Sequence, residues 1–159
     1  MSRDIAENKI SKILSGKLTN ASGAINDDAD IRIPGFLIEC KRRETTKGKI
    51  VFYTKVWEKL RKQSIKTCRI PLYIFQAKGD SYCITWLNAI EDLIRGKHIG
   101  CFNINVKCNI KSNVIIKVDD FNDVYKGYTF NKFNVATFKY NNITFGIIDL
   151  DALYRLTKE

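Results

Sequence analysis

Residues 29–41 of this chain are ADIRIPGFLIECK, and this stretch carries the strongest local signal for the fold. Two short runs of β-branched and large apolar side chains flank the dipeptide Pro34-Gly35, which is typical of a tight turn. The pattern predicts a β-hairpin in which Ile33 faces Phe36. The hairpin in turn fixes which charged residues of the stretch meet.

Continued outward, the same pairing sets Asp30 directly opposite Glu39. Carboxylates that face each other across an antiparallel ladder have Cβ atoms about 4.5–5.5 Å apart and repel, so we expect positive charge between them. Strand alternation puts Lys41 on the same face as Glu39 and turns Ile38 and Cys40 the other way. One face of the strand is therefore expected to be charged and the other apolar.

A pair of carboxylates offers oxygen ligands only. Such ligands suit a hard cation, Mg²⁺ or Mn²⁺, better than zinc, which prefers His or Cys. The side chain of Lys41 would then be placed to orient a water molecule on that cation as the ammonium, or to deprotonate it as the neutral amine. The stretch predicts a metal-dependent hydrolytic site.

These residues resemble the signature of the PD-(D/E)xK nuclease superfamily, in which an acidic residue and a spacer precede (D/E)-x-K on the next strand. Asp30 takes the first position, Glu39 and Lys41 take the second, and Ala29 stands where proline is usual. The order and spacing of these residues carry the resemblance, which covers about residues 3–86.

The details are most similar to the small Holliday-junction resolvases of archaea and phages. In that group a Ser-Gly loop precedes the aspartate and a helix glutamate completes the site, and Ser22-Gly23 and Glu7 occupy those places here. The segment RIPLYIFQ, residues 69–76, is similar to the strand that follows the basic helix of these enzymes.

The resemblance implies a restriction-endonuclease-like core and a Mg²⁺ ion held by Asp30, Glu39 and the backbone carbonyl of Cys40. Glu7 would contribute directly or through a water molecule. Symmetric cutting of a four-way DNA junction needs two active sites, so the resemblance also implies a homodimer.

Three of these assignments have alternatives. Glu7 also fits a capping box that begins at Asp4, although helical periodicity places it at the end of an apolar stripe. Asp28 has the same strand parity as Asp30 and competes with it as a ligand. Ser22 lies in a polar cluster that is equally typical of an ordinary turn.

The positive charge of the chain is concentrated in one segment. Of a net charge of +10, residues 41–69 account for +9, because they hold eleven basic residues against Glu44 and Glu58. A basic block directly after an acidic motif would attract a polyanion to it, since phosphate contacts release counterions and supply most non-specific affinity.

Within that segment, Thr54 is predicted to be the N-cap of a helix that ends near Thr67, with lysines recurring along one side. A solvated lysine face is the alternative, but composition bias would scatter lysines rather than concentrate them. We therefore predict a nucleic-acid interface formed by Ser22, Arg42, Arg43, Lys47, Lys49, Lys55, Lys59, Lys62 and Lys66.

The chain has 159 residues, of which 45% are hydrophobic, enough for one substantial core. We predict one α/β domain over 1–159, with a mixed sheet flanked by helices (about 3–96) and a β-rich C-terminal extension (about 97–159). The expected elements are helices at 4–16, 54–67 and 86–95, the hairpin at 29–41, a basic linker at 42–53, strands at 70–77, 81–86, 102–107, 114–117, 133–140 and 143–150, and a last helical turn at 151–158.

The five cysteines form no C-x-x-C motif and are odd in number, which favours reduced thiols. No apolar run reaches the length of a membrane span and the N-terminus is charged, so we expect a cytoplasmic protein (the host cytoplasm if viral) without a membrane partner.

The leading hypothesis is a Mg²⁺-dependent endodeoxyribonuclease that resolves Holliday junctions. One alternative is a restriction-like or repair endonuclease that cuts duplex or branched DNA. An alternative of another class is a DNA-binding module of the same fold without catalysis.

Overall fold

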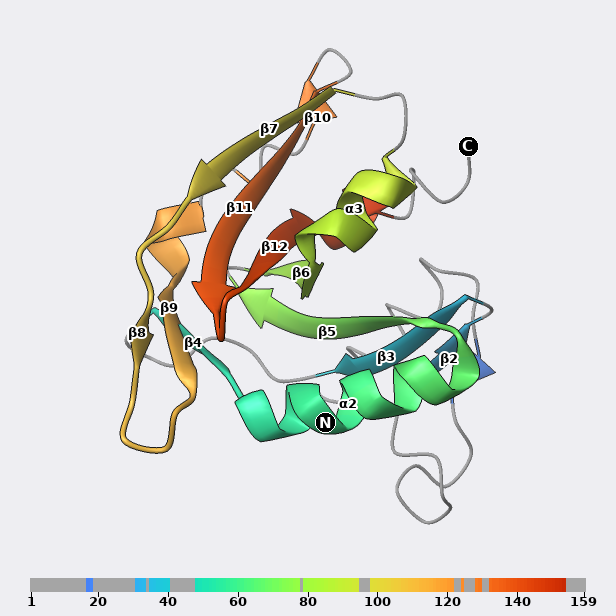
Figure 1. Cartoon of the computed structure of the whole chain (residues 1–159). Helices are drawn as coiled ribbons and strands as arrows, with labels where there is room; N and C mark the ends of the chain where they lie inside the picture. Colours follow the sequence, from blue (N-terminus) through green and yellow to red (C-terminus); the bar gives the residue numbers. More distant parts are fainter. Residues whose placement is uncertain are drawn as a thin grey trace.

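The computed structural model describes residues 17–18, 31–33, 35–40, 48–77, 79–94, 98–121, 124, 128–129 and 132–153. Its centre is a mixed sheet of nine strands among these residues, with the order β1-β2-β3-β5-β6-β12-β11-β10, and β7 beside β11 (Figure 1). The prediction of an α/β protein with a mixed central sheet is confirmed. The strands are β1 (Lys17–Leu18), β2 (Ile31–Ile33), β3 (Phe36–Cys40), β5 (Ile70–Ala77), β6 (Asp80–Trp86), β7 (His98–Asn103), β10 (Tyr128–Thr129), β11 (Lys132–Tyr140) and β12 (Ile143–Asp149).

The predicted hairpin is present with the predicted register. Ile33 pairs with Phe36 and Ile31 with Ile38 in the antiparallel β2–β3 ladder. Gly35 adopts φ +87°, a conformation that favours glycine. Asp30 lies outside the described residues, so its pairing with Glu39 stays a prediction.

Strand β5 lies beside β3 and parallel to it. The connection between the two strands contains helix α2 (Thr54–Thr67). The predicted strand after the basic helix is therefore confirmed, and it runs parallel to β3. Since β3 is paired with β2 on one side and β5 on the other, it is an interior strand. Its residue Glu39 pairs with Tyr73 of β5.

The expected basic linker at 42–53 is wrong in part, because it contains strand β4 (Lys49–Phe52). This strand belongs to a second, three-stranded sheet with β9 (Val114–Lys117) and β8 (Lys107–Cys108). Ile50 and Phe52 are buried, so the short alternating run is stabilised by packing against distant parts of the chain.

The two faces of the central sheet bury two hydrophobic cores. One core contains Leu37, Trp57 of α2 and Phe145. The other contains Ile38 and Ile90, the latter from helix α3 (Leu87–Leu93). Because neighbouring residues of a strand point to opposite faces, α2 and α3 cover opposite sides of the sheet (Figure 1).

Gly146 of β12 allows the close approach of α3. A Cβ atom at this position would lie 2.7 Å from Cδ1 of Ile90 and 2.9 Å from Cγ1 of Val135, which is closer than carbon atoms can pack. The absence of a side chain at this residue therefore sets the distance between helix and sheet.

Most other predicted elements after α2 are confirmed, including the hairpin of β11 and β12 over Asn141-Asn142, both of which have positive φ. The predicted strand at 102–107 is wrong, because β7 ends at Asn103 and β8 begins at Lys107. Strand β12 pairs with β6, so the C-terminal strands continue the central sheet. Among the described helices, none combines the length and apolar character needed to cross a bilayer.

Asp149 ends β12 and holds the turn that follows, because its Oδ1 accepts a hydrogen bond from the backbone N–H of Ala152 at 3.1 Å. The pKa of this carboxyl is raised to about 6, mainly by burial; the Ala152 N–H opposes this rise, and the charges of Asp151 and Asp80 add to it. The folded protein thus binds this proton more tightly than the unfolded chain does.

We expect Asp149→Asn to make unfolding less dependent on pH between about 4 and 6. When the pKa of a carboxyl is higher in the folded protein than in the unfolded chain, protonation of that carboxyl stabilises the fold. This stabilisation is complete below the pKa of the unfolded chain and is lost as the pH rises through the pKa of the folded protein. The amide keeps the oxygen that accepts from Ala152 and carries no charge. At pH 7 the variant should be more stable by about 1 kcal/mol, since solvent screens part of the effect.

Urea unfolding of both proteins at pH 4 and pH 7 measures this difference. Asp151→Asn, at an exposed neighbour, is the control and should change stability much less. A stability gain for Asp149→Asn that is equal at both pH values would contradict the prediction.

Candidate functional site

Glu39 is the best-defined acidic residue of the predicted catalytic motif. It lies near the end of β3, is half-buried, and points to the face of the sheet that α2 covers, since Leu37 of the same parity is buried in the α2-side core. The face of Glu39 therefore also carries a buried apolar residue, and the expectation that Asp30 and Lys41 join Glu39 on it stays a prediction, because both lie outside the described residues. Cys40 is buried in the opposite core.

Tyr73, the partner of Glu39 in the parallel ladder, ties three elements together. Its hydroxyl donates to the carbonyl oxygen of Val51 at 3.1 Å and accepts from the backbone N–H of Tyr53 at 3.2 Å. Burial raises the pKa of Tyr73 far above its ordinary value, and the nearby charge of Glu39 raises it further. The neutral hydroxyl thus fixes the end of β4 and the start of α2 beside the strand of Glu39.

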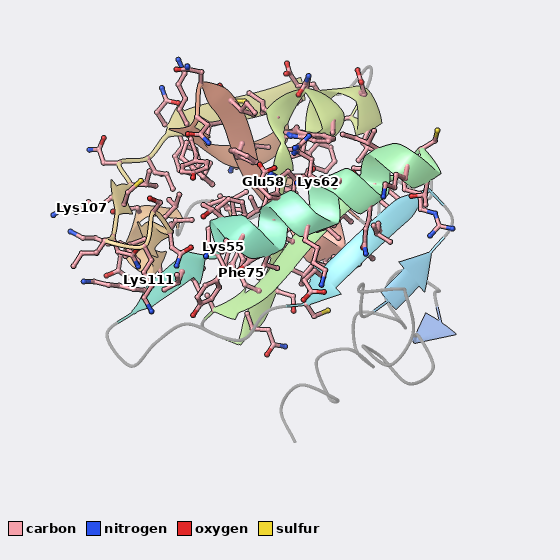
Figure 2. The ribbon with its side chains drawn as sticks, turned by 60° about the horizontal axis from the view of Figure 1, so that its bottom comes forward. Lys55, Glu58, Lys62, Phe75, Lys107 and Lys111 are labelled. Carbon is pink, nitrogen blue, oxygen red and sulfur yellow. The ribbon has the colours of Figure 1, made fainter. Side chains whose placement is uncertain are left out.

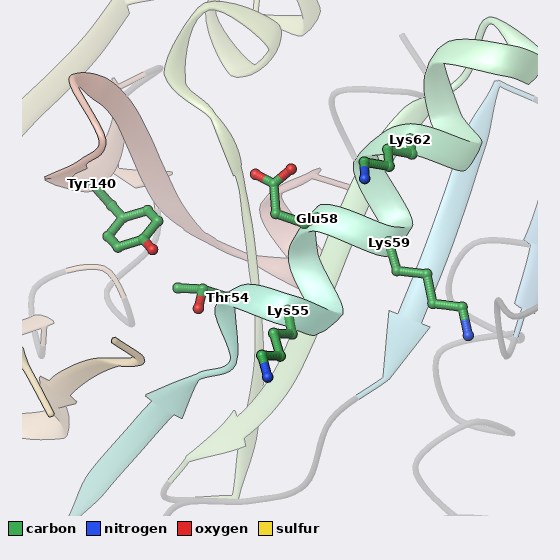
Figure 3. Close-up of a pocket in the computed structure, with 6 residues that line it drawn as sticks. All are labelled: Thr54, Lys55, Glu58, Lys59, Lys62 and Tyr140. Carbon is green, nitrogen blue, oxygen red and sulfur yellow. The ribbon is translucent and has the colours of Figure 1, made fainter. Parts of the chain in front are cut away.

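The exposed face of α2 carries the predicted lysine stripe. Lys55, Lys59, Lys62 and Lys66 are all exposed on one helix. An open hollow of about 420 Å³ lies at its N-terminal half (Figure 3), and its lining consists of Thr54, Lys55, Glu58, Lys59, Lys62 and Tyr140.

The single acidic residue in the lining of this hollow is engaged by a neighbour. Arg61 donates to Oε2 of Glu58 through Nε at 3.0 Å and Nη2 at 2.8 Å. In Figure 3, Glu58 extends away from Lys55 and Lys59. The hollow therefore keeps an excess of positive charge, which suits an anionic ligand such as phosphate.

The start of α2 is capped by a distant segment. The N-cap residue is Tyr53, which makes no side-chain cap, so the prediction of Thr54 as N-cap is wrong. Thr54 is the first helical residue, and its N–H donates to Oδ1 of Asn113 at 3.2 Å. Its hydroxyl donates to the carbonyl oxygen of Ser112 at 3.2 Å. The turn between β8 and β9 thus supplies the oxygen that a local residue was expected to provide.

This contact brings further lysines to the interface that the sequence patterns did not indicate. Figure 2 shows Lys107 and Lys111, from the β8–β9 hairpin, beyond the N-terminal end of α2, with Lys107 at the edge of the molecule in this view. Lys117 of β9 joins them, opposite Lys49 of β4 in the strand ladder, and Lys49 is the half-buried member of the interface that the sequence did predict. The only sequence signal was the charge itself, because the pairing that gathers these residues is long-range.

The remaining candidate residues of the predicted site lie outside the described part of the chain: Glu7, Ser22, Asp28, Asp30, Lys41, Arg42, Arg43 and Lys47. Within the described ranges, no group of three or more His, Cys, Asp or Glu side chains is arranged to hold a metal ion. Of the proposed ligands, only Glu39 and Cys40 belong to these ranges.

Comparison with known proteins adds no family assignment. No model of a known protein family matches the chain, and no curated protein matches its sequence.

Proposed function

We propose that this protein is a Mg²⁺-dependent endodeoxyribonuclease, most similar in its site to Holliday-junction resolvases, that acts as a cytoplasmic homodimer on branched DNA. The observation that carries the proposal is the position of Glu39. It is a half-buried carboxylate on an interior strand, covered by a helix whose outer face is lined with lysines.

A carboxylate near the end of an interior strand is held in place by the sheet and offers oxygen ligands of the kind that a hard cation prefers. A cation that binds there together with substrate would use this side chain as a ligand. The observed hairpin register supports a second carboxylate nearby, since one further step of the ladder would pair Glu39 with Asp30.

The oxygen donors proposed for the ion fit Mg²⁺ by chemical type: the carboxylates of Asp30 and Glu39 and the backbone carbonyl of Cys40. The ion would supply Lewis acidity at the phosphodiester and a more acidic bound water. Lys41 would orient the attacking water, and Glu7 would support the site directly or through a second water molecule. Mn²⁺ has the same ligand preference and should substitute.

The lysine face of α2 would hold the DNA backbone close to this site. Helix α2 contacts β3, the strand that carries Glu39, and Figure 3 shows Lys55, Lys59 and Lys62 extending from this helix. Phosphate contacts at Lys55 and Lys62 would then fix the strand over the hollow.

A cleavage assay tests the proposal. Four-way junction, flap, duplex and single-stranded DNA would be incubated with the protein, with and without Mg²⁺. The proposal expects Mg²⁺-dependent scission, fastest on the junction. Scission of duplex at the same rate would favour the restriction-like alternative. Metal-independent binding without scission would identify a non-catalytic DNA-binding module.

We expect the triple variant Lys55→Gln, Lys59→Gln, Lys62→Gln to bind all DNA sequences more weakly and with a flatter salt dependence. Each lost phosphate contact reduces the slope of log affinity against log salt by about 0.9 for duplex DNA. A reduction of about 2–3 is therefore expected, measured by fluorescence anisotropy at several salt concentrations.

Lys139→Gln is the control for this series. Lys139 is exposed on β11, and its parity places it on the opposite side of the sheet from Tyr140 of the hollow. A triple variant with the parental slope would show that the binding face lies elsewhere.

A further inference from the structure

The tip of the β8–β9 hairpin presents an apolar side chain to solvent. Ile110 is fully exposed, whereas the other exposed large hydrophobic residues among those described retain more cover. The segment from Lys107 to Lys117 contains three lysines and no acidic residue. The tip therefore offers an aliphatic side chain next to cationic ones on a hairpin without acidic residues, the combination with which proteins insert apolar wedges between DNA base steps.

The tip is held rigidly by its own hydrogen bonds. Oδ1 of Asn109 accepts from the backbone N–H groups of Lys111 and Asn113, at 2.9 and 3.0 Å. The N–H of Ser112 donates to the carbonyl oxygen of Asn109 at 3.0 Å. The N–H of Asn109 donates to the carbonyl oxygen of Asn113 at 2.9 Å. Ile110 is therefore fixed in an exposed position before any partner binds, which lowers the entropic cost of using it.

The same tip is attached to the lysine face. Thr54 bonds to both Ser112 and Asn113, so the hairpin and the first turn of α2 form one unit. In Figure 2 the hairpin that carries Lys107 and Lys111 lies beyond the end of α2 at which Lys55 begins the stripe. A polyanion that follows the stripe on α2 would reach the hairpin tip next.

We propose that the hairpin tip is a wedge that inserts Ile110 between bases of DNA at a weakly stacked point, a mismatch or a branch, while Lys107 and Lys111 bind the flanking phosphates. Aliphatic wedges enter DNA between base steps at the cost of unstacking. That cost is smallest where pairing is already disturbed. The wedge would thus select distorted DNA and deliver it to the surface of α2.

This inference rests on the DNA binding of the proposed function and not on its cleavage chemistry. The test is therefore carried out in EDTA, where no scission occurs. Two duplexes of the same length carry 2-aminopurine, one fully paired and one beside a mismatch. Affinity and 2-aminopurine fluorescence are measured for each.

The parental protein should prefer the mismatched duplex and increase its 2-aminopurine fluorescence. Ile110→Ser should lose roughly tenfold in affinity for mismatched DNA and lose the fluorescence change, with paired-duplex affinity and salt slope unaltered. Ile110→Met should keep both properties. Ile65→Ser, at an exposed isoleucine of α2, should behave as the parent, whereas Lys111→Gln should flatten the salt slope for both duplexes.

If Ile110→Ser kept the parental preference for mismatched DNA and the parental change in 2-aminopurine fluorescence, the wedge proposal would be wrong. Equal loss of affinity for both duplexes would also overturn it, because it would indicate a general contact. If the protein bound no DNA, both this inference and the proposed function would fail. If the wedge behaved as expected but Mg²⁺ produced no scission, only the catalytic assignment would fail.

Discussion

Replacing Glu39 by Gln should reduce Mg²⁺-dependent cleavage by at least roughly 10²–10³-fold, the usual effect of removing one electrostatic group that acts on the transition state. The amide keeps the size of the side chain but loses the charge that would bind the ion. DNA binding should survive or become tighter, because a negative charge near the phosphates is removed. Single-turnover cleavage of a labelled junction, together with anisotropy in EDTA, measures both effects.

Glu58→Gln is the matched control, since Glu58 lies in the basic hollow but is paired with Arg61. It should cleave close to the parental rate. Asp30→Asn should be as inactive as Glu39→Gln if the two carboxylates share an ion. Parental cleavage by the Glu39 variant would refute its assignment to the active site.

Replacing Trp57 by Ala should destabilise the protein by about 3–5 kcal/mol, the typical cost of truncating a buried Trp or Phe. Trp57 is fully buried and packs edge-on against two rings, Phe145 at 5.2 Å and Trp86 at 5.6 Å between centroids. It also contacts Phe52 of β4 at 5.8 Å. One side chain therefore joins α2 to both sheets.

Urea unfolding followed by far-ultraviolet circular dichroism measures this loss. Ile65→Ala is the control, since Ile65 lies on the same helix but is exposed, and it should change stability by less than about 0.5 kcal/mol. A loss below about 1 kcal/mol in the Trp57 variant would mean that α2 is not anchored through this residue. If the substitution detaches α2 from the sheets, Trp57→Ala should also bind DNA poorly.

The parts of the fold that sequence patterns predicted are those set by local interactions. The β2–β3 register follows from a two-residue turn with glycine in its required conformation. Helix α2 follows from its 3.6-residue pattern, and β5 follows from an apolar run long enough to be buried on both faces. These signals lie within a few residues of the structures they predict.

The errors lie where distant residues decide the outcome. Strand β4 is only four residues long and is stabilised by β9, so nothing in its own sequence separated it from a linker. Thr54 was predicted to be the N-cap from local sequence, but the oxygen that accepts from the first turn of α2 belongs to Asn113, 59 residues away in sequence. In the candidate site, the helical spacing of the lysines on α2 predicted the stripe. It could not predict Lys107 and Lys111, because only tertiary pairing brings their hairpin to α2.

The pairing of β12 with β6 and of β4 with β9 has a consequence for biosynthesis. While the ribosome is still making the second half of the chain, β4 and β6 lack their partners, and their unpaired edges are open to aggregation. The central sheet that contains the β2–β3 hairpin cannot be completed until residue 149, the end of β12, has left the ribosome. Folding of this protein is therefore expected to be largely post-translational and slow for its size, as long-range strand pairing requires.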